Sequence, residues 1–149
     1  MSDADLDQST SGSSIAKLPA LAALVALVGL GDAVYLTVHH LTAEPVPCGI
    51  TGGCETVLTS SYAEIAGIPL AAFGAAAYFA AFSLALLAAF GNRMTWLLFG
   101  VQVVLMSVFT GYLLYLQAYI IGAFCQFCLL SAATTFTMLG IFIASRFTR

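Results

Sequence analysis

The apolar stretch LPALAALVALVGLGDAVYLTVHHL occupies residues 18–41 and decides the fold class. A helix crosses the hydrocarbon core of a bilayer with about 20 mostly apolar residues, and this stretch is long enough to do so. Further stretches of similar character follow at about residues 68–90, 95–121 and 127–144. None alternates between apolar and polar residues as the strands of a membrane β-barrel do. The sequence therefore predicts a bundle of four transmembrane helices, because backbone groups in lipid must be paired within each segment.

The composition of the whole chain supports the same fold class. Of its 149 residues, 61% are hydrophobic and only 7% are charged. A soluble domain carries roughly 25% charged residues, so this chain must have the lipid bilayer as its solvent. The formal net charge of −3 offers no basic patch, which argues against nucleic acid as a partner. We expect one all-α integral membrane domain over residues 15–149, preceded by a disordered tail rich in Ser, Asp and Thr over residues 1–14.

The few basic residues indicate which side of the membrane each loop occupies. With four spans both termini lie on one side, and every Lys and Arg of the chain falls on that side. They are Lys17, Arg93, Arg146 and Arg149. The positive-inside rule assigns this side to the cytoplasm. The loop over residues 42–66 and the connection near residues 121–126 then lie on the outer face of a cell (plasma or inner) membrane.

All four cysteines fall on the predicted outer face, where disulfides persist. Cys48 and Cys54 flank a glycine-rich segment that can swing and can close its own disulfide. Cys125-Gln-Phe-Cys128 is a C-x-x-C at the start of the fourth helix, where unpaired N–H groups and the helix dipole stabilise a thiolate. Cys128 lies one turn deeper than Cys125, within reach of a molecule dissolved in lipid. A mobile, water-facing pair and a fixed, lipid-facing pair together indicate a thiol–disulfide relay.

Other interpretations of these residues stay open at the level of the sequence. Four cysteines allow three pairings, and two static disulfides would make the chain a non-enzymatic membrane scaffold. A zinc site is a second alternative, but the five-residue spacing between Cys48 and Cys54 is irregular for structural zinc, so we expect no metal. A third alternative is a small transporter with a polar path through Asp32, His39 and Gln117.

Several motifs resemble those of the vitamin K epoxide reductase family, in its bacterial or archaeal branch. They are Gly31-Asp-Ala-Val-Tyr-Leu-Thr37 with His39-His-Leu41, the loop Cys48-x₅-Cys54, Cys54-Glu-Thr-Val-Leu-Thr-Ser-Ser61, Gly67-Ile-Pro-Leu70, and Phe124-Cys-Gln-Phe-Cys-Leu-Leu-Ser-Ala132. The resemblance covers the chain from about residue 18. The order of the motifs is specific, because the loop pair precedes the C-x-x-C.

The resemblance implies a role for each cysteine. It makes Cys128 the residue that faces and reduces a quinone, and Cys125 its disulfide partner. Cys54 is then the loop cysteine that attacks Cys125, and Cys48 exchanges with a thioredoxin-like protein outside the cytoplasm. Ser60 matches a serine near the quinone. The expected activity is that of an enzyme, a thiol oxidoreductase that reduces a quinone of menaquinone or ubiquinone type and supports disulfide bond formation.

Two departures from the family refine this expectation. Some relatives carry a fused thioredoxin-like domain, whereas this chain ends at Arg149 without one, so we expect a separate partner. The animal enzymes carry an Asn and a Tyr that touch the quinone, and these positions fall at Leu70 and Ala132 here. This favours a respiratory quinone over vitamin K epoxide as the substrate.

Further residues are candidates for the quinone site. Asp32 lies in the outer third of the first helix, where a carboxyl group within hydrocarbon is costly and suggests a function. Tyr35 and His39 share its helical face, and the three residues either carry protons or form a packed polar trio. Aromatic residues are candidates for the wall of the site: Phe73, Tyr78 and Tyr115.

The end of the first outer loop carries a helix signal. Ser61-Tyr-Ala-Glu64 has the pattern of a capping box. It predicts a short interfacial helix that ends at Gly67, after which Pro69 starts the second transmembrane helix.

Overall fold

The structure, a computed structural model, describes residues 3–42, 56, 61 and 64–147, with side chains from residue 17 onward. This part of the chain contains the long helices α1 (Asp3–Thr42), α3 (Leu70–Ala89), α4 (Arg93–Tyr115) and α5 (Gln126–Phe147). Four segments are long and apolar enough to cross a membrane: Lys17–Thr42, Leu70–Ala89, Arg93–Ile121 and Gln126–Phe147. Their ends lie within three residues of those predicted from the sequence. The predicted four-helix membrane fold is confirmed, and the chain is a multi-pass membrane protein.

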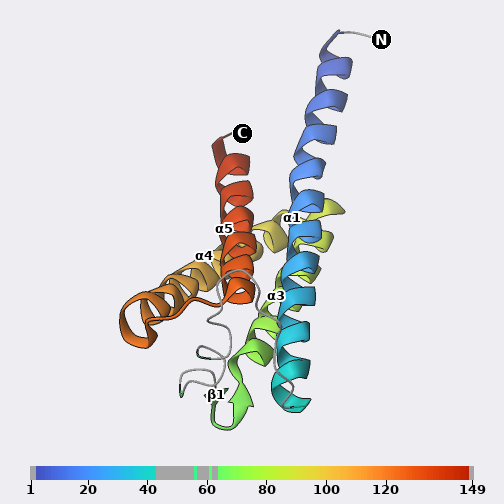
Figure 1. Cartoon of the computed structure of the whole chain (residues 1–149). Coiled ribbons are helices and arrows are strands. Elements are labelled where there is room, and N and C mark those ends of the chain that lie inside the picture. The colour runs from blue at the N-terminus through green and yellow to red at the C-terminus, as the bar shows by residue number, and fades with distance from the viewer. Residues whose placement is uncertain (1–2, 43–55, 57–60, 62–63, 148–149) are drawn as a thin grey trace.

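The helices form a bundle in which α1 and α4 each pack against both α3 and α5. The helices α3 and α5 are therefore diagonal partners across the bundle. Figure 1 shows the N-terminal end of α1 and the C-terminal end of α5 at one end, and the short hairpin labelled β1 at the other. This agrees with an even number of spans, while the assignment of the two ends to cytoplasm and exterior stays a prediction from the basic residues.

Small side chains let α1 and α3 approach each other closely, as they do in many membrane bundles. Four alanines of these two helices are completely buried: Ala22, Ala26, Ala81 and Ala85. Gly29 of α1 serves the same purpose for a larger neighbour, because a Cβ atom at this position would overlap the ring of Tyr78. The close packing of α1 on α3 thus depends on residues that contribute little volume.

The N-terminus differs from the prediction. The helix α1 begins at Asp3, so residues 3–14, predicted as a disordered tail, are helical in the structure. Starting a helix is costly, but each residue added to an existing helix gains one hydrogen bond, so a long apolar helix supports a polar extension. Pro19 lies inside α1 without ending it.

The end of the first outer loop also differs from the prediction. Strand β1 (Glu64–Ile65) pairs antiparallel with β2 (Ile68–Pro69), so the predicted interfacial helix does not extend from Glu64 to Gly67. The turn residues Ala66 and Gly67 have positive φ angles of 56° and 83°, which suits a two-residue hairpin turn of type I′. Gly67, which the capping-box interpretation takes as a helix end, instead supplies the second residue of this turn. As predicted, Pro69 directly precedes α3.

The third span ends in a turn that the sequence did not predict. The helix α4 continues into the π-helical segment η2 (Leu116–Ile121), which ends at Gly122 with a positive φ of 73°. Such π-helical turns are rare and occur frequently at functional sites. Here the turn leads directly to Cys125 at the start of α5.

Candidate active site

Cys125 lies immediately before α5 and caps its N-terminus. The Leu129 N–H donates the first helical hydrogen bond to the Cys125 carbonyl, at 2.9 Å. The Cys125 sulfur accepts hydrogen bonds from the Cys128 thiol and from the backbone N–H groups of Cys128 and Phe127. The hydrogen bond from the Cys128 thiol, reinforced by these N–H groups, lowers the pKa of Cys125 from 9.0 to about 7 against the opposing effect of burial. The thiolate of Cys125 therefore forms at a lower pH than that of an ordinary cysteine.

Gln117, in η2, holds the segment that leads to Cys125. Its backbone carbonyl accepts a hydrogen bond from the Gly122 N–H at 3.0 Å. Its buried side-chain Oε1 accepts another from the Cys125 N–H at 3.2 Å. Residues 122–125 are thus tied at both ends to one residue. This anchoring role differs from the role of Gln117 in the alternative interpretation of the chain as a transporter, where it would form part of a polar path.

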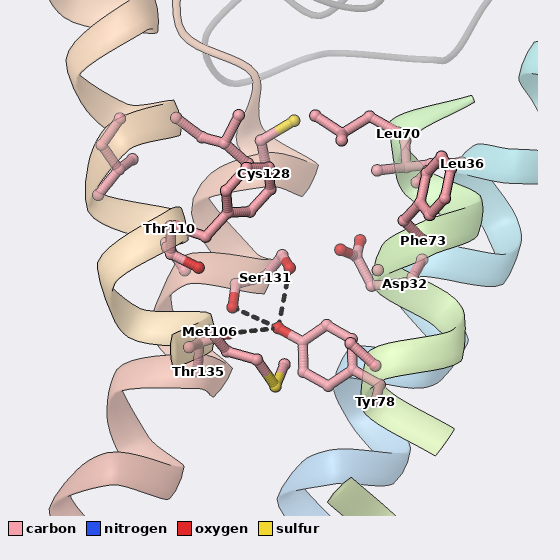
Figure 2. A pocket seen from close by; sticks show the side chains of 18 of the residues that line it. Asp32, Leu36, Leu70, Phe73, Tyr78, Met106, Thr110, Cys128, Ser131 and Thr135 are labelled. Carbon is pink, nitrogen blue, oxygen red and sulfur yellow. Dashed lines mark hydrogen bonds between the residues drawn. The ribbon is translucent and has the colours of Figure 1, made fainter. Parts of the chain in front are cut away.

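A cavity of about 400 Å³ lies among the four long helices, and Cys128 lines it. Cys125 is completely buried and lies outside the cavity wall. Figure 2 shows Cys128 at one side of the cavity, across from Leu70 and Phe73. Most of the wall is apolar, with Leu36, Leu70, Phe73, Met106, Phe109 and Leu113 among its residues. The volume falls in the range of roughly 300–1,000 Å³ that small-molecule sites occupy.

Tyr78 carries the main polar cluster of the cavity wall. Its buried hydroxyl lies 2.6 Å from the Ser131 carbonyl oxygen and 2.7–2.8 Å from the hydroxyls of Ser131, Thr134 and Thr135. Figure 2 shows three of these contacts, which cross from α3 to its diagonal partner α5. The hydroxyl is fully engaged by the protein, so Tyr78 is first of all a tie between these two helices.

Asp32 faces the same cavity from α1 (Figure 2). Only 8% of the residue is exposed, and neither carboxyl oxygen has a hydrogen-bond partner among the described residues. The carboxyl lies close enough to Cys125 and Cys128 to interact electrostatically with both sulfurs. A buried polar group without a partner is rare in native proteins and requires an explanation.

The polar trio predicted on α1 does not form. Tyr35 and His39 lie outside the cavity wall, and their rings pack on each other with centroids 4.3 Å apart. Tyr35 also packs on Phe127 of α5, at 5.3 Å between centroids. The next residue, His40, does line the cavity, and its Nε2 lies 2.5 Å from Oε1 of Glu64 in the hairpin. Residues at spacings of three and seven share a broad helical face, but only part of that face borders the cavity.

The other candidate residues fall into three groups. Phe73 and Tyr78 line the cavity, as do Leu70 and Ala132. Tyr115 does not: its half-exposed ring packs on Tyr119, with centroids 5.3 Å apart. Tyr115 lies off the face of α4 and η2 that borders the cavity, so the prediction that it forms part of the cavity wall is wrong. Cys48, Cys54 and Ser60 lie outside the described residues.

Several wall residues were not identified from the sequence: Met106, Phe109, Thr110, Leu113, Ser131 and Thr135. A signal for them exists. On α4 and η2 the wall residues from Met106 to Gln117 recur every three or four positions, and on α5 they follow Cys128 at the same helical spacing. Projecting this spacing from Cys128 would have found Ser131 and Thr135.

Comparison with known proteins adds independent information. The model of the vitamin K epoxide reductase family matches residues 20–143, which include all four cysteines and Asp32. A relative in Arabidopsis thaliana, thiol-disulfide oxidoreductase LTO1, is 31% identical over 116 residues. The match covers 72% of this chain and 31% of that relative, so the chain spans about a third of the relative's length.

Proposed function

The chain belongs to the vitamin K epoxide reductase family, and on that premise we propose that it is a membrane thiol oxidoreductase that passes electrons to a quinone. The observation that carries the proposal is the position of Cys128. This residue lines an apolar cavity inside the bundle and donates a hydrogen bond to Cys125 at the same time. A dithiol thus borders a space that suits a small molecule dissolved in lipid.

The lining of the cavity supports a quinone head group as the proposed ligand. Its wall supplies the aromatic faces of Phe73 and Phe109 and apolar side chains around them. It also supplies the unpartnered carboxyl group of Asp32, which suits a polar oxygen on the ligand. A bound quinone would take up two electrons and two protons. The apolar residues Leu70 and Ala132 in the wall favour a menaquinone or ubiquinone type over vitamin K epoxide.

The two cysteines of the C-x-x-C have different tasks in this proposal. Cys128 presents its sulfur to the cavity, while Cys125 is held behind the wall with a lowered pKa. Oxidation of the pair forms the Cys125–Cys128 disulfide and releases two electrons, together with two protons when both sulfurs start as thiols. The hydrogen bonds from the start of α5 keep the Cys125 sulfur nucleophilic near neutral pH. Gln117 keeps it within reach of Cys128.

The loop cysteines complete the proposed relay. Reduced Cys54 attacks the Cys125 sulfur of the Cys125–Cys128 disulfide and forms a mixed disulfide, which frees the Cys128 thiol. Cys48 then attacks Cys54, which restores the Cys125 thiol and leaves a Cys48–Cys54 disulfide. A thioredoxin-like protein on the outer face reduces that disulfide through Cys48 and becomes oxidised. The chain would thereby support disulfide formation in exported proteins.

A membrane scaffold with structural disulfides fits the C-x-x-C poorly. A Cys125–Cys128 disulfide would close a loop within the first turn of one helix and join no two elements. A disulfide stabilises chiefly by restricting the unfolded chain, and the effect is smallest for the shortest loops. A staple at this position would therefore add little stability.

The proposal is tested by anaerobic mixing of the oxidised protein with a reduced thioredoxin-like donor and a soluble quinone, following quinone absorbance. We expect donor-dependent loss of quinone in the wild type and none in Cys128→Ser. Cys48→Ser should fail with the protein donor but work with a small dithiol. Ser83→Ala is the matched control and should behave as the wild type, because among the described residues the Ser83 hydroxyl bonds only the Phe79 carbonyl of its own helix. Failure of the wild type with every donor and quinone would reject the proposal.

A further inference from the structure

The carboxyl group of Asp32 is the ionisable group of the cavity wall that lacks a hydrogen-bond partner among the described residues, although both of its oxygens are buried. The hydroxyls of Tyr78, Ser131 and Thr135 satisfy one another. Oε1 of Gln117 accepts the Cys125 N–H. Both oxygens of Asp32, by contrast, are buried and unbonded within the described part of the chain. Retaining such a group inside a membrane bundle is costly, which indicates a use for it.

The surroundings of Asp32 favour its neutral, protonated form. The other titratable side chains of the cavity wall are Cys128 on α5, Tyr78 on α3 and His40 on α1, and Cys125 lies behind the wall. His40 is paired with Glu64. No Lys or Arg belongs to the cavity wall as described, and the basic residues of α4 and α5, Arg93 and Arg146, lie at the opposite ends of those helices from η2 and Cys128. A carboxylate in an apolar site with neither a cation nor a hydrogen-bond donor is strongly disfavoured.

The proposed quinone reduction needs a source of protons as well as of electrons. Reduction of a quinone consumes two electrons and two protons. The dithiol Cys125–Cys128 supplies both electrons, but it supplies both protons only when both sulfurs are protonated. Because the pKa of Cys125 is lowered, its thiolate forms at a lower pH than that of an ordinary cysteine, and this form of the pair brings only the proton of Cys128. One proton is then missing.

We propose that Asp32 is the acid that supplies this missing proton, an inference that rests on the proposed quinone reduction. The Cys125 thiolate and the Cys128 thiol become a disulfide, two electrons pass to the quinone, and its oxygens receive one proton from Cys128 and one from Asp32. The products are a disulfide, a quinol and the Asp32 carboxylate. Atoms and charge balance, because the single negative charge moves from Cys125 to Asp32.

The proton returns to Asp32 from the hairpin end of the bundle. His40 lines the cavity there, and its partner Glu64 is 49% exposed at the side chain. Eight residues of helix separate His40 from Asp32, which corresponds to about 12 Å. Water within the cavity must bridge this distance, and a cavity of about 400 Å³ has room for it.

The test uses the full-length, prereduced protein in a single turnover with a soluble quinone, across a range of pH. In Asp32→Asn only the form with both thiols protonated can react fully. Its rate should match the wild type at low pH and fall relative to it by up to tenfold for each pH unit above the point at which the Cys125 thiol ionises, a point measured separately from the thiolate absorbance. Asp32→Glu, which keeps an acid, should restore a profile close to that of the wild type. Thr37→Val, one turn away on α1 with its hydroxyl bonded to the Ala33 carbonyl, is the control.

A second readout does not depend on turnover. At pH 7 exposed carboxyl groups are ionised, so infrared spectra should show one protonated-carboxyl band that shifts in D₂O and is lost in Asp32→Asn. Absence of that band in the wild type would overturn the proposal. So would a defect of Asp32→Asn that is the same at every pH, or no defect while the wild type reduces quinone. If the wild type itself reduced no quinone, the proposed function would fail first.

Discussion

Replacing Tyr78 with phenylalanine tests how the diagonal helices α3 and α5 are held together. The substitution keeps the ring that packs against Gly29 and removes only the hydroxyl among Ser131, Thr134 and Thr135. A tyrosine hydroxyl donates one hydrogen bond and accepts two, so three of its four close contacts are made at one time. Hydrogen bonds between membrane helices contribute about 0.6 kcal/mol each on average. We therefore expect Tyr78→Phe to lower the free energy of unfolding by about 2 kcal/mol.

The assay is reversible unfolding in mixed micelles by increasing the mole fraction of a denaturing detergent. Fluorescence of the single, buried Trp96 reports the transition. The control is Ser83→Ala, because the hydroxyl of Ser83 bonds the carbonyl of Phe79 in its own helix, at 2.9 Å, and no other group in the described part of the chain. This variant should change stability by less than about 0.5 kcal/mol. A Tyr78→Phe protein as stable as this control would refute the view that the hydroxyl cluster joins α3 to α5.

Three further predictions concern the packing of α1 and the setting of the C-x-x-C. Gly29→Ala should destabilise the fold by about 1–3 kcal/mol, because the new methyl group overlaps the ring of Tyr78. Gly31→Ala is the control and should not destabilise it, because the space around Gly31 is open. Equal effects of the two substitutions in the unfolding assay would contradict the close packing of Gly29 on Tyr78. Gln117→Leu leaves the Cys125 N–H without its acceptor and should lower stability by about 1–3 kcal/mol, with Gln117→Glu losing less in the same assay. Cys128→Ala removes the Cys128 thiol, whose hydrogen bond is the largest cause of the low Cys125 pKa. The thiolate absorbance of Cys125 should therefore titrate near pH 7 in the wild type and at clearly higher pH in the variant. An unchanged midpoint would mean that the backbone N–H groups alone lower the Cys125 pKa.

The spans were predictable from the sequence because hydrocarbon thickness imposes a length and a composition on each helix. The hairpin was not, because Ala66 takes a positive φ that non-glycine residues seldom adopt. The turn of η2 shifts the helical register near the end of the third span. Tyr115 precedes this turn, and it lies off the cavity wall because the wall residues of α4 follow a helical spacing from Met106 that does not include it. The sequence alone does not show which face of the third span borders the cavity.

Part of the candidate site was likewise predictable from the sequence, and part was not. The cost of a carboxyl group in lipid marked Asp32 without any structure, and the cavity that it faces agrees with that signal. Tyr78 was identified as an aromatic wall residue, but its link to α5 depends on Ser131, Thr134 and Thr135 coming together across the bundle. No local pattern predicts a contact between residues more than fifty positions apart.

The most direct test of the central claim is a single anaerobic turnover of a variant without the loop cysteines, Cys48→Ser/Cys54→Ser. The prereduced variant retains only Cys125 and Cys128, so any electrons that reach a soluble quinone must come from this pair. We predict one quinol per chain, with a Cys125–Cys128 disulfide found by mass spectrometry of the product. No quinol, or quinol without that disulfide, would contradict the claim that Cys128 and Cys125 deliver electrons to a quinone in the cavity.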